Sequence, residues 1–356
     1  MISIIGAGPA GSYTAHLLSK KGYNVTIFEE HNKIGLPLQC AGIVTDYMNK
    51  IIKLDSEIIQ NKLKYVEIVS PYNKTVKLPS NDIVIDRVKF DMHLANLAKD
   101  SGAQIITNAR YINNTKQKVI IKRNNTSSSM YSDIIIGADG PLSQVAKINN
   151  MFGNRKFYYG IQARVEINCD PSTYKVFFGD FAKKFFAWQI PESDKIARVG
   201  LATLTSTRNE FNYFLKKLGN PKVIDMQGGL IPIYDPKQNV QKENIFLIGD
   251  AATQVKASTG GGIIQGMMAG KILTKSIITK TSYKENLSKL NKDLMLHLRI
   301  RNYLNKFSPK DYDSLISLCA QKRIQKVLRS TSRDEVFSLG LKLLMLEPRF
   351  LRFLKI

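Results

Sequence analysis

Three glycines near the start of the chain have the spacing of a loop that binds a dinucleotide. Gly6, Gly8 and Gly11 follow the apolar segment 2–5 and precede a segment with helical spacing. In such a loop the first glycine permits a tight turn, the second lets a pyrophosphate approach the backbone, and the third lets helix and strand pack closely. Ala10 lies in the first helical turn, at the positive end of the helix dipole. The spacing therefore predicts a site for dinucleotide phosphates.

A carboxylate follows at the distance that suits a ribose. Glu29 ends the next expected strand, 18 residues after Gly11. A carboxylate in this position accepts the ribose hydroxyls of an adenosine and would repel a 2′-phosphate. Glu30 is adjacent, but we expect it to point to the opposite face of the strand. Glu29 is therefore the predicted ribose ligand, and the alternative is a glycine turn without a ligand.

Two glycine–aspartate motifs each stand at the end of a later expected strand. Residues 137–140 are Gly-Ala-Asp-Gly, and residues 249–252 are Gly-Asp-Ala-Ala. Asp250 is in a position to accept a ribityl hydroxyl. Gly262 and Ile263 open a long helix whose backbone N–H groups can face the pyrimidine O2 of a flavin and stabilise the anionic reduced ring. The order and context of the motifs predict FAD.

The elements around these motifs alternate between strand and helix. Helical spacing over Ala10–Lys20 is followed by a strand at Val25–Glu29, which makes a right-handed βαβ unit with the first segment. A helix is expected around Phe90–Ser101, and buried strands at Asp133–Gly137 and Ile245–Ile248. This pattern predicts a Rossmann-like domain.

The segments between the last two strands have a different pattern. They are β-branched and aromatic, and turn residues separate them, which is typical of an antiparallel sheet; they cover Tyr158–Val165, Tyr174–Phe178, Phe185–Ile190 and Ile196–Leu204. After Gly260 the pattern is helical to Ile356. The predicted fold is α/β, with a Rossmann-like FAD-binding domain (1–60, 86–150, 236–280), an inserted antiparallel β-sheet substrate domain (61–85, 151–235) and a C-terminal helical region (281–356).

Composition excludes several classes of protein. With 44% hydrophobic and 23% charged residues among 356, the chain has enough apolar area to fold. No apolar run reaches the roughly 18 residues of a membrane span, and we expect no signal peptide, because the residues before Gly6 have neither a basic lead nor a cleavage site. Three dispersed cysteines and four histidines fit neither a disulfide framework nor a metal site. We expect a cytoplasmic protein without a metal.

The charge is strongly positive and concentrated at the C-terminus. The formal net charge is +23, and residues 271–356 carry 19 basic and 7 acidic side chains. An anionic partner could be nucleic acid, a phosphate-bearing ligand or a membrane face, and the alternative is a solvated Lys-rich surface. The segment Phe337–Ile356 has the pattern of a basic amphipathic helix interrupted near Pro348. It suits either an anionic membrane interface or packing on the flavin domain.

Together these residues resemble a known family. The glycine motifs, Glu29 and the sequence Asp86-Arg87 followed by Phe90-Asp91 resemble the FAD-binding fold of the aromatic hydroxylase superfamily. Within it, Leu38–Ile43 is similar to the cysteine-containing flavin loop of the geranylgeranyl reductases, as is the triple-glycine segment Val255–Ile263. A third similarity is the aromatic–Trp–Pro motif Phe186–Pro191, followed by Val199-Gly200.

The resemblance implies a function and a set of site residues. The family uses FAD to reduce isolated double bonds of prenyl chains, notably those of archaeal-type ether phospholipids. It implies that Cys40 lies against the flavin, orients the substrate and relays a proton. It also assigns the remaining site residues: Ala41, Ile43, Arg87 and the backbone of Ala109 to the cofactor, and Phe186, Trp188 and Pro191 to the wall of a prenyl tunnel. Simpler interpretations are a packed Cys40, a surface ion pair at Arg87 and a Trp188 in the sheet core.

Two other functions compete with this interpretation. The stretch Phe186–Pro191 also resembles a segment of flavin halogenases, so a flavin-dependent monooxygenase or halogenase is the main alternative. A basic nucleic-acid-binding module is disfavoured, because the chain contains no recognised nucleic-acid motif and we expect no nucleic acid as partner. The expected partners are a prenylated lipid phosphate, an anionic membrane surface and an external electron donor, which is ferredoxin or a reduced nicotinamide.

Overall fold

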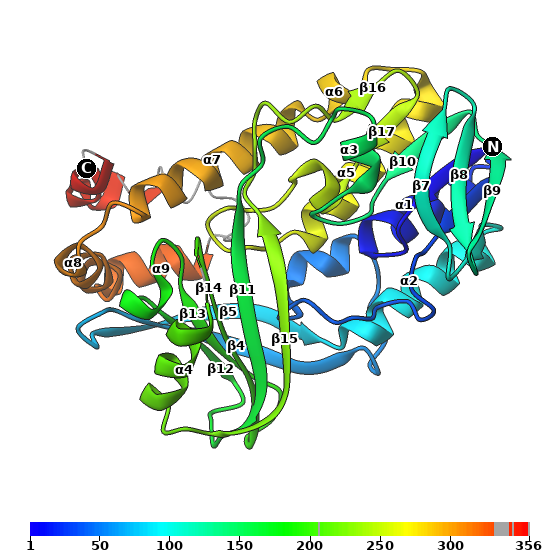
Figure 1. Ribbon diagram of the computed structural model, residues 1–356. Helices are drawn as coiled ribbons and strands as arrows, with labels where there is room; N and C mark the ends of the chain where they lie inside the picture. The colour runs from blue at the N-terminus through cyan, green and yellow to red at the C-terminus, as the bar shows by residue number, and fades with distance from the viewer. Residues whose placement is uncertain (206, 331–341, 344, 355–356) are drawn as a thin grey trace. The chain divides into compact units, whose positions relative to one another are not determined.

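The computed structural model describes residues 1–205, 207–330, 342–343 and 345–354, and it divides into two compact units (Figure 1). The first unit consists of residues 1–38, 86–156 and 231–295, and the second of residues 39–85, 157–230 and 296–356. No helix among the described residues is long and apolar enough to cross a membrane.

The first unit is built on a six-stranded sheet. The strand order is β16-β17-β10-β1-β2-β6, and all neighbours are parallel except the antiparallel pair β16–β17. The bounds are β1 Ile2–Ile5, β2 Val25–Phe28, β6 Gln104–Ile106, β10 Ile134–Gly137, β16 Gln241–Lys242 and β17 Ile245–Leu247. The predicted Rossmann-like arrangement is therefore confirmed. Consecutive parallel strands require crossovers, and the glycine loop begins the first of them.

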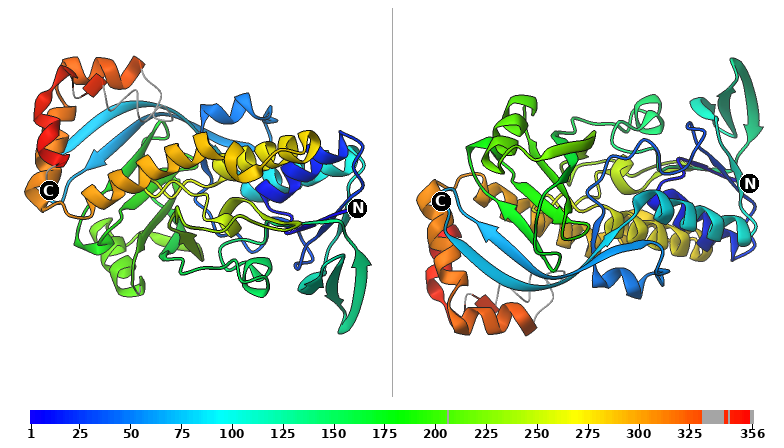
Figure 2. Two further views of the ribbon diagram at one scale, coloured as in Figure 1. Left: turned by 90° about the horizontal axis from the view of Figure 1, so that it is seen from above. Right: turned by 90° about the horizontal axis from the view of Figure 1, so that it is seen from below.

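Helix α1 (Pro9–Ser19, blue in Figure 2) packs against both α2 (Arg87–Asp100, cyan) and α5 (Ile263–Thr279, yellow). Helix α2 begins three residues before the predicted start at Phe90. The reason is that the Asp86 side chain caps the helix by accepting a hydrogen bond from the Lys89 N–H at 3.0 Å. Shorter helical segments are α3 (Gln144–Ile148), η3 (Gly249–Ala252) and α6 (Tyr283–Asn286), and a three-stranded sheet consists of β7 (Arg110–Thr115), β8 (Lys118–Arg123) and β9 (Thr126–Tyr131).

The second unit contains an eight-stranded sheet with the order β15-β11-β14-β13-β12-β4-β5-β3. The bounds are β3 Ile43–Thr45, β4 Ile59–Val69, β5 Thr75–Ile85, β11 Phe157–Glu166, β12 Thr173–Phe177, β13 Ala187–Pro191, β14 Ile196–Thr203 and β15 Lys222–Pro232. The predicted antiparallel sheet is present, with the difference that β12 and β4 pair in parallel, Thr173 opposite Tyr65. Helix α4 (Arg208–Lys217) packs Phe211 and Phe214 into the core of this unit.

The chain is mainly helical beyond the last strand. Helix α7 (Ser288–Leu304) is followed by α8 (Pro309–Cys319) and α9 (Lys322–Ser330). Part of the predicted amphipathic helix at 337–356 lies outside the described residues. In the described part, residues 342–343 and 345–346 are helical, and a 3₁₀ segment, η4, covers Pro348–Leu354. Short 3₁₀ turns also occur at η1 (Asp46–Lys50) and η2 (Asp180–Ala182).

Candidate functional site

In the loop between β1 and α1, close packing within the protein requires glycine at Gly6 and Gly11 but not at Gly8. A Cβ on Gly6 would clash with the Ala138 carbonyl and one on Gly11 with the Gly6 carbonyl, both nearer than the 3.0 Å that real Cβ contacts keep, and Gly6 has φ +102°. Gly8 has φ −69° and ψ 177°, which any residue can adopt, and a Cβ there would meet no atom within 4 Å. The space in front of Gly8 therefore fits a ligand that approaches the backbone, as a pyrophosphate does.

Glu29 is tied to this loop. Its Oε2 accepts a hydrogen bond from the Ala7 N–H at 2.8 Å, and its Oε1 accepts from the His31 N–H at 3.0 Å and lies 2.7 Å from His31 Nδ1. The neighbouring Glu30 pairs with Arg110 at 3.8 Å. Ala109 is buried, and its N–H donates to the Glu29 carbonyl at 2.8 Å. Oε2, which has one partner, keeps a second lone pair with which it can accept a ribose hydroxyl, whereas Oε1 already has two partners in His31.

Asp250 and the start of α5 come together. Asp250 lies in η3, directly after β17, and a Cβ on Gly262 would lie 3.0 Å from Asp250 Oδ1. Desolvation raises the pKa of Asp250 to about 6, although the positive charges of Arg87 and Arg155 oppose that shift. Helix α5 has Gly262 as its N-cap without a side-chain cap, so its first-turn N–H groups, including that of Ile263, are available to an acceptor. The carboxylate can accept from ribityl hydroxyls and the N–H groups of the helix N-terminus can donate to ring oxygens, so the pair suits a flavin.

Close packing of α1 and α5 holds this arrangement in place. A Cβ on Gly266 would lie 3.1 Å from the Gly249 Cα and 3.2 Å from the Ala10 Cβ. Ala10, predicted at the phosphate site, therefore also packs against the turn that carries Asp250. The glycine loop at 6–11 and the 249–252 motif are thus both held at the contact between α1 and α5.

Arg87 makes an ion pair with Asp91, but the two side chains are 14% and 5% exposed, so this is not the surface ion pair of the simpler interpretation. Its Nε and Nη2 donate to the two carboxylate oxygens of Asp91 at 3.0 and 2.9 Å. Burial raises the pKa of Asp91, and the Arg87 charge opposes that rise. Since Arg87 also lowers the pKa of Asp250, the guanidinium belongs to the same charged cluster. Its contact with a cofactor stays a prediction.

Arg155 is a site residue that the sequence motifs did not indicate. It is buried, and its guanidinium donates to the carbonyls of Phe152, Pro141 and Ala251 at 2.9 to 3.1 Å and to Gln238 Oε1 at 3.0 Å. Burial lowers its pKa to about 10, while Asp139, Asp235 and Asp250 oppose that shift. A single arginine outside every motif has no sequence signal. In the structure it links the turn after 137–140 to the 249–252 motif.

The cysteine loop lies in the second unit. Cys40 is half-buried, and its Sγ accepts a hydrogen bond from the Gly42 N–H at 3.3 Å. Ala41 directs its carbonyl at Arg198 Nη1, 2.6 Å away, and the Gly42 carbonyl accepts from the Ile85 N–H at 2.7 Å. Ile43 opens β3, opposite Val84 of β5. The thiol is thus on a turn with defined backbone anchors.

The aromatic motif joins the cysteine loop in one apolar cluster. The buried residues of this cluster are Leu63, Val84, Tyr174 and Ile190, and Ala41, Ile43 and Trp188 pack against them. Trp188 also donates from Nε1 to Gln162 Oε1 at 2.7 Å. Phe186 precedes β13 and meets Trp188 edge-on, with ring centroids 6.1 Å apart. Pro191 ends β13 in a buried position.

An aromatic and cationic group surrounds Phe186. Phe185 stacks on Phe186 with centroids 4.3 Å apart, and the buried Arg301 guanidinium carbon lies 4.6 Å from the Phe185 centroid. Tyr158 and Phe185 have centroids 4.5 Å apart. Arg301 is another residue that lies outside every sequence motif. Cation–π contacts of this kind keep an arginine in an otherwise apolar surrounding.

Comparison with known proteins places these features in context. A family model described as an NAD(P)-binding Rossmann-like domain matches residues 4–47. Digeranylgeranylglycerophospholipid reductase 2 of Methanosphaera stadtmanae is 30% identical over 369 residues, covering 92% of this chain and 93% of that protein. Reductase 3 of the same organism is 28% identical, with 92% of each covered.

Solved structures share the fold. A geranylgeranyl bacteriochlorophyll reductase-like protein from Thermoplasma acidophilum has a TM-score of 0.78 and 21% identity, covering 96% of this chain and 98% of that one. A triple mutant of the flavin-dependent brominase Bmp2 has a TM-score of 0.73 and 14% identity over the same shares. Similarity at these identities supports the fold and leaves the reaction to the site residues.

Proposed function

The chain belongs to the digeranylgeranylglycerophospholipid reductase family, and we propose that it uses FAD to saturate double bonds of geranylgeranyl chains on ether phospholipid precursors. The observation that carries the proposal is the apolar cluster in which Ala41 and Ile43, the neighbours of Cys40, pack with Trp188. A prenyl chain needs an apolar surface next to a proton-bearing group, and this cluster includes Ala41, the residue that follows Cys40 in the chain.

Most of the flavin-binding residues in the proposal lie in the first unit. The open space at Gly8 suits the pyrophosphate, Glu29 the adenosine ribose, Asp250 the ribityl chain, and the start of α5 the pyrimidine. Arg87, Ala109 and the cysteine loop keep the cofactor roles that the family resemblance assigns to them. FAD, when bound and reduced, supplies a hydride.

The second unit supplies the other requirements of the reaction. An isolated alkene is unactivated, so one hydride and one proton must add across the same bond in a dry, shaped surrounding. We assign Cys40 to the proton: the Gly42 N–H holds Sγ in one orientation. Trp188, Phe186 and Pro191 are assigned to the prenyl chain, which they orient and shield from water.

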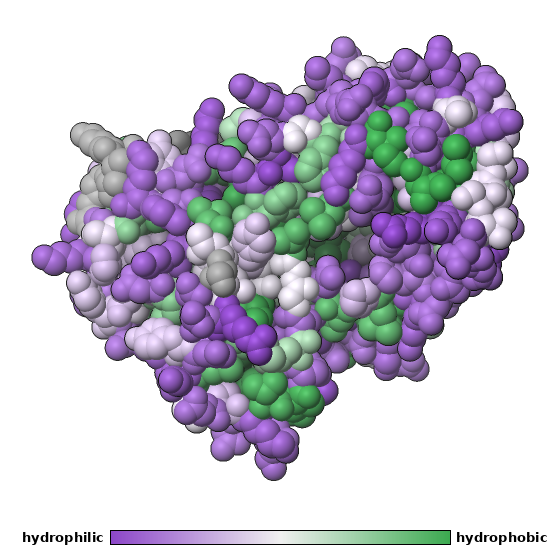
Figure 3. Space-filling view, viewed as in Figure 1, coloured by the Kyte–Doolittle hydropathy of each residue, from purple (hydrophilic) through white to green (hydrophobic). Residues whose placement is uncertain are grey.

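The proposal includes an anionic membrane surface where the lipid is delivered. The net charge is +23, and the face drawn in Figure 3 is largely hydrophilic, with hydrophobic side chains in separate patches. In the C-terminal part, Met345, Leu346 and Leu351 are exposed close in sequence to Lys342 and Arg349. Exposed apolar and basic side chains together suit an interface with anionic lipid. We propose a cytoplasmic protein that attaches peripherally to the membrane.

Flavin-dependent oxygenation or halogenation is the second candidate, because a brominase shares the fold with a TM-score of 0.73. Reduced enzymes of that class react with oxygen. Rapid oxygen consumption by the reduced protein in the absence of lipid would favour it. The electron donor, ferredoxin or a reduced nicotinamide, is identified by which of the two reduces the bound flavin.

The test begins with an absorbance spectrum of the purified protein. The protein is then reduced with dithionite under nitrogen and mixed with a geranylgeranyl ether lipid phosphate. We expect a flavin spectrum, reoxidation by the lipid and a lipid mass that rises by two hydrogens per bond. A bound flavin that ignores the lipid but reacts rapidly with air contradicts the reductase and favours the oxygenase. A protein that binds no flavin after reconstitution with FAD contradicts both.

A further inference from the structure

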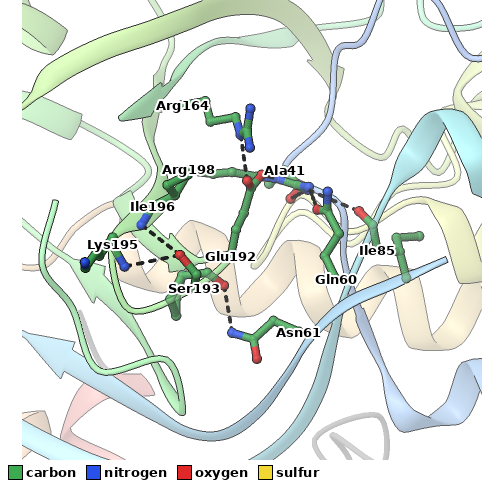
Figure 4. Close-up of polar contacts among 11 residues, drawn as sticks. Ala41, Gln60, Asn61, Ile85, Arg164, Glu192, Ser193, Lys195, Ile196 and Arg198 are labelled. Carbon is green, nitrogen blue, oxygen red and sulfur yellow. Dashed lines mark hydrogen bonds and ion pairs between the residues drawn. The ribbon is translucent and has the colours of Figure 1, made fainter. Parts of the chain in front are cut away.

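A buried ion pair lies beneath the cysteine loop in the second unit (Figure 4). Arg198 of β14 donates from Nε to Glu192 Oε1 at 2.7 Å, and the two side chains are 5% and 8% exposed. Buried ion pairs stabilise little by themselves, because desolvation offsets their attraction. Because this pair lies beside the cysteine loop, we consider a role other than stability for it.

Arg198 directs its remaining donors at the loop and at the strands beside it. Nη1 donates to the Ala41 carbonyl at 2.6 Å and to the Ile85 carbonyl at 3.3 Å, and Nη2 donates to Gln60 Oε1. The rigid guanidinium fork can serve these acceptors at once, whereas a lysine ammonium has no such geometry.

The Arg198 guanidinium leaves no room for a side chain at position 42, which is a glycine. A Cβ at this position would clash with Arg198 Nη1 and lie 2.7 Å from the Ile85 carbonyl, and the residue has φ +69°. The guanidinium thus occupies the space that a side chain at 42 would take. The same glycine donates its N–H to Cys40 Sγ. The backbone that Arg198 anchors is therefore the backbone that orients the thiol.

Glu192 keeps Arg198 in this orientation and also contacts a second arginine. Arg164 and Arg198 lie directly opposite each other on β11 and β14, a pairing of like charges that would be unfavourable alone. Glu192 lies between them: its Oε2 accepts from Arg164 Nε at 2.6 Å. Arg164 is 39% exposed, and among the described residues it makes no hydrogen bond or ion pair with the loop. It therefore provides a matched control.

We propose that Arg198 is a positioning residue that sets the orientation and accessibility of the Cys40 thiol through the Ala41 carbonyl, with Glu192 fixing the guanidinium. Its importance for catalysis rests on the proposed function, in which Cys40 handles the proton. Its effect on the thiol does not, because thiol reactivity can be measured without lipid.

The test measures the alkylation rate of each cysteine by iodoacetamide in the folded, FAD-reconstituted protein, with mass spectrometry of the peptides. Cys169 and Cys319 serve as internal references. Because a lost charge-assisted hydrogen bond frees the loop, we expect Arg198→Lys and Arg198→Gln to accelerate alkylation of Cys40 about tenfold. The reference cysteines should keep their rates, and Arg164→Gln should leave all three rates unchanged.

Three results would overturn the proposal: an unchanged Cys40 rate in Arg198→Lys, an equal acceleration in Arg164→Gln, or a parallel acceleration of all three cysteines, which would indicate general destabilisation. If Arg198→Gln does not fold, Arg198→Lys carries the test, since it keeps the positive charge. A wild-type protein that reduces no lipid but shows the selective Cys40 effect contradicts the proposed function and supports the positioning role.

Discussion

Replacing Gly8 with alanine tests the flavin site without disturbing the fold. The backbone at Gly8 is extended, with φ −69° and ψ 177°, and a Cβ would meet no protein atom within 4 Å. Nothing in the protein therefore requires glycine here. If the position needs glycine, the reason is a ligand that comes close to the backbone.

The expected magnitudes separate folding from binding. Alanine restricts the unfolded chain, which stabilises by about 0.4–1 kcal/mol, but alanine is a poorer N-cap than glycine by a similar amount. We therefore expect the free energy of unfolding without cofactor to change by less than about 1 kcal/mol. A methyl group forced against a pyrophosphate costs about 1–3 kcal/mol, so the Kd for FAD should rise about 5- to 150-fold.

The assay compares urea unfolding of the cofactor-free protein with FAD titration followed by flavin fluorescence. Gly11→Ala is the contrasting variant, because its Cβ would clash with the Gly6 carbonyl and should destabilise the fold itself. An unchanged Kd for Gly8→Ala would refute the assignment of the pyrophosphate to this loop. A loss of stability as large as that of Gly11→Ala would refute the packing argument.

Three further predictions concern Asp250, Arg155 and Cys40. Burial raises the pKa of Asp250 to about 6, so between about pH 4 and 6 the unfolded state holds fewer protons than the cofactor-free folded state. The free energy of unfolding therefore falls as the pH rises through that window, by about 3 kcal/mol in total. Asp250→Asn should remove this loss, and urea midpoints that shift equally with pH in both proteins would contradict it. Arg155→Met should destabilise in thermal unfolding by about 1–3 kcal/mol for each buried acceptor that it leaves unpaired. The exposed Lys156→Met serves as control, and an equal effect in both variants would refute the role of Arg155. Cys40→Ala should slow lipid reduction about 100-fold at saturating FAD, whereas an unchanged rate would show that the proton comes from elsewhere.

Local patterns predicted the elements around the cofactor motifs well. The strands near 25–29, 133–137 and 245–248 and the helix after the first glycine loop are present within one or two residues. The start of α2 was predicted three residues too late, because the Asp86 cap outweighs the apolar spacing that begins at Phe90. In the sheet of the second unit, alternation indicated strands but not their partners, so the parallel pairing of β12 with β4 was not foreseen.

The sequence by itself determined the glycine loop, the carboxylate after the second strand and the family, because each depends on residues close together in the chain or on whole-chain similarity. Only the tertiary structure decided which backbone carbonyls the buried arginines contact. Arg155 reaches Ala251, 96 positions away, and Arg198 reaches Ala41, 157 positions away. Hydrogen bonds between residues so distant leave no periodicity in the chain, since burial and geometry rather than spacing select their partners. For the same reason, the open space at Gly8 and the crowding at Gly6 and Gly11 look alike as sequence and differ only in the folded protein.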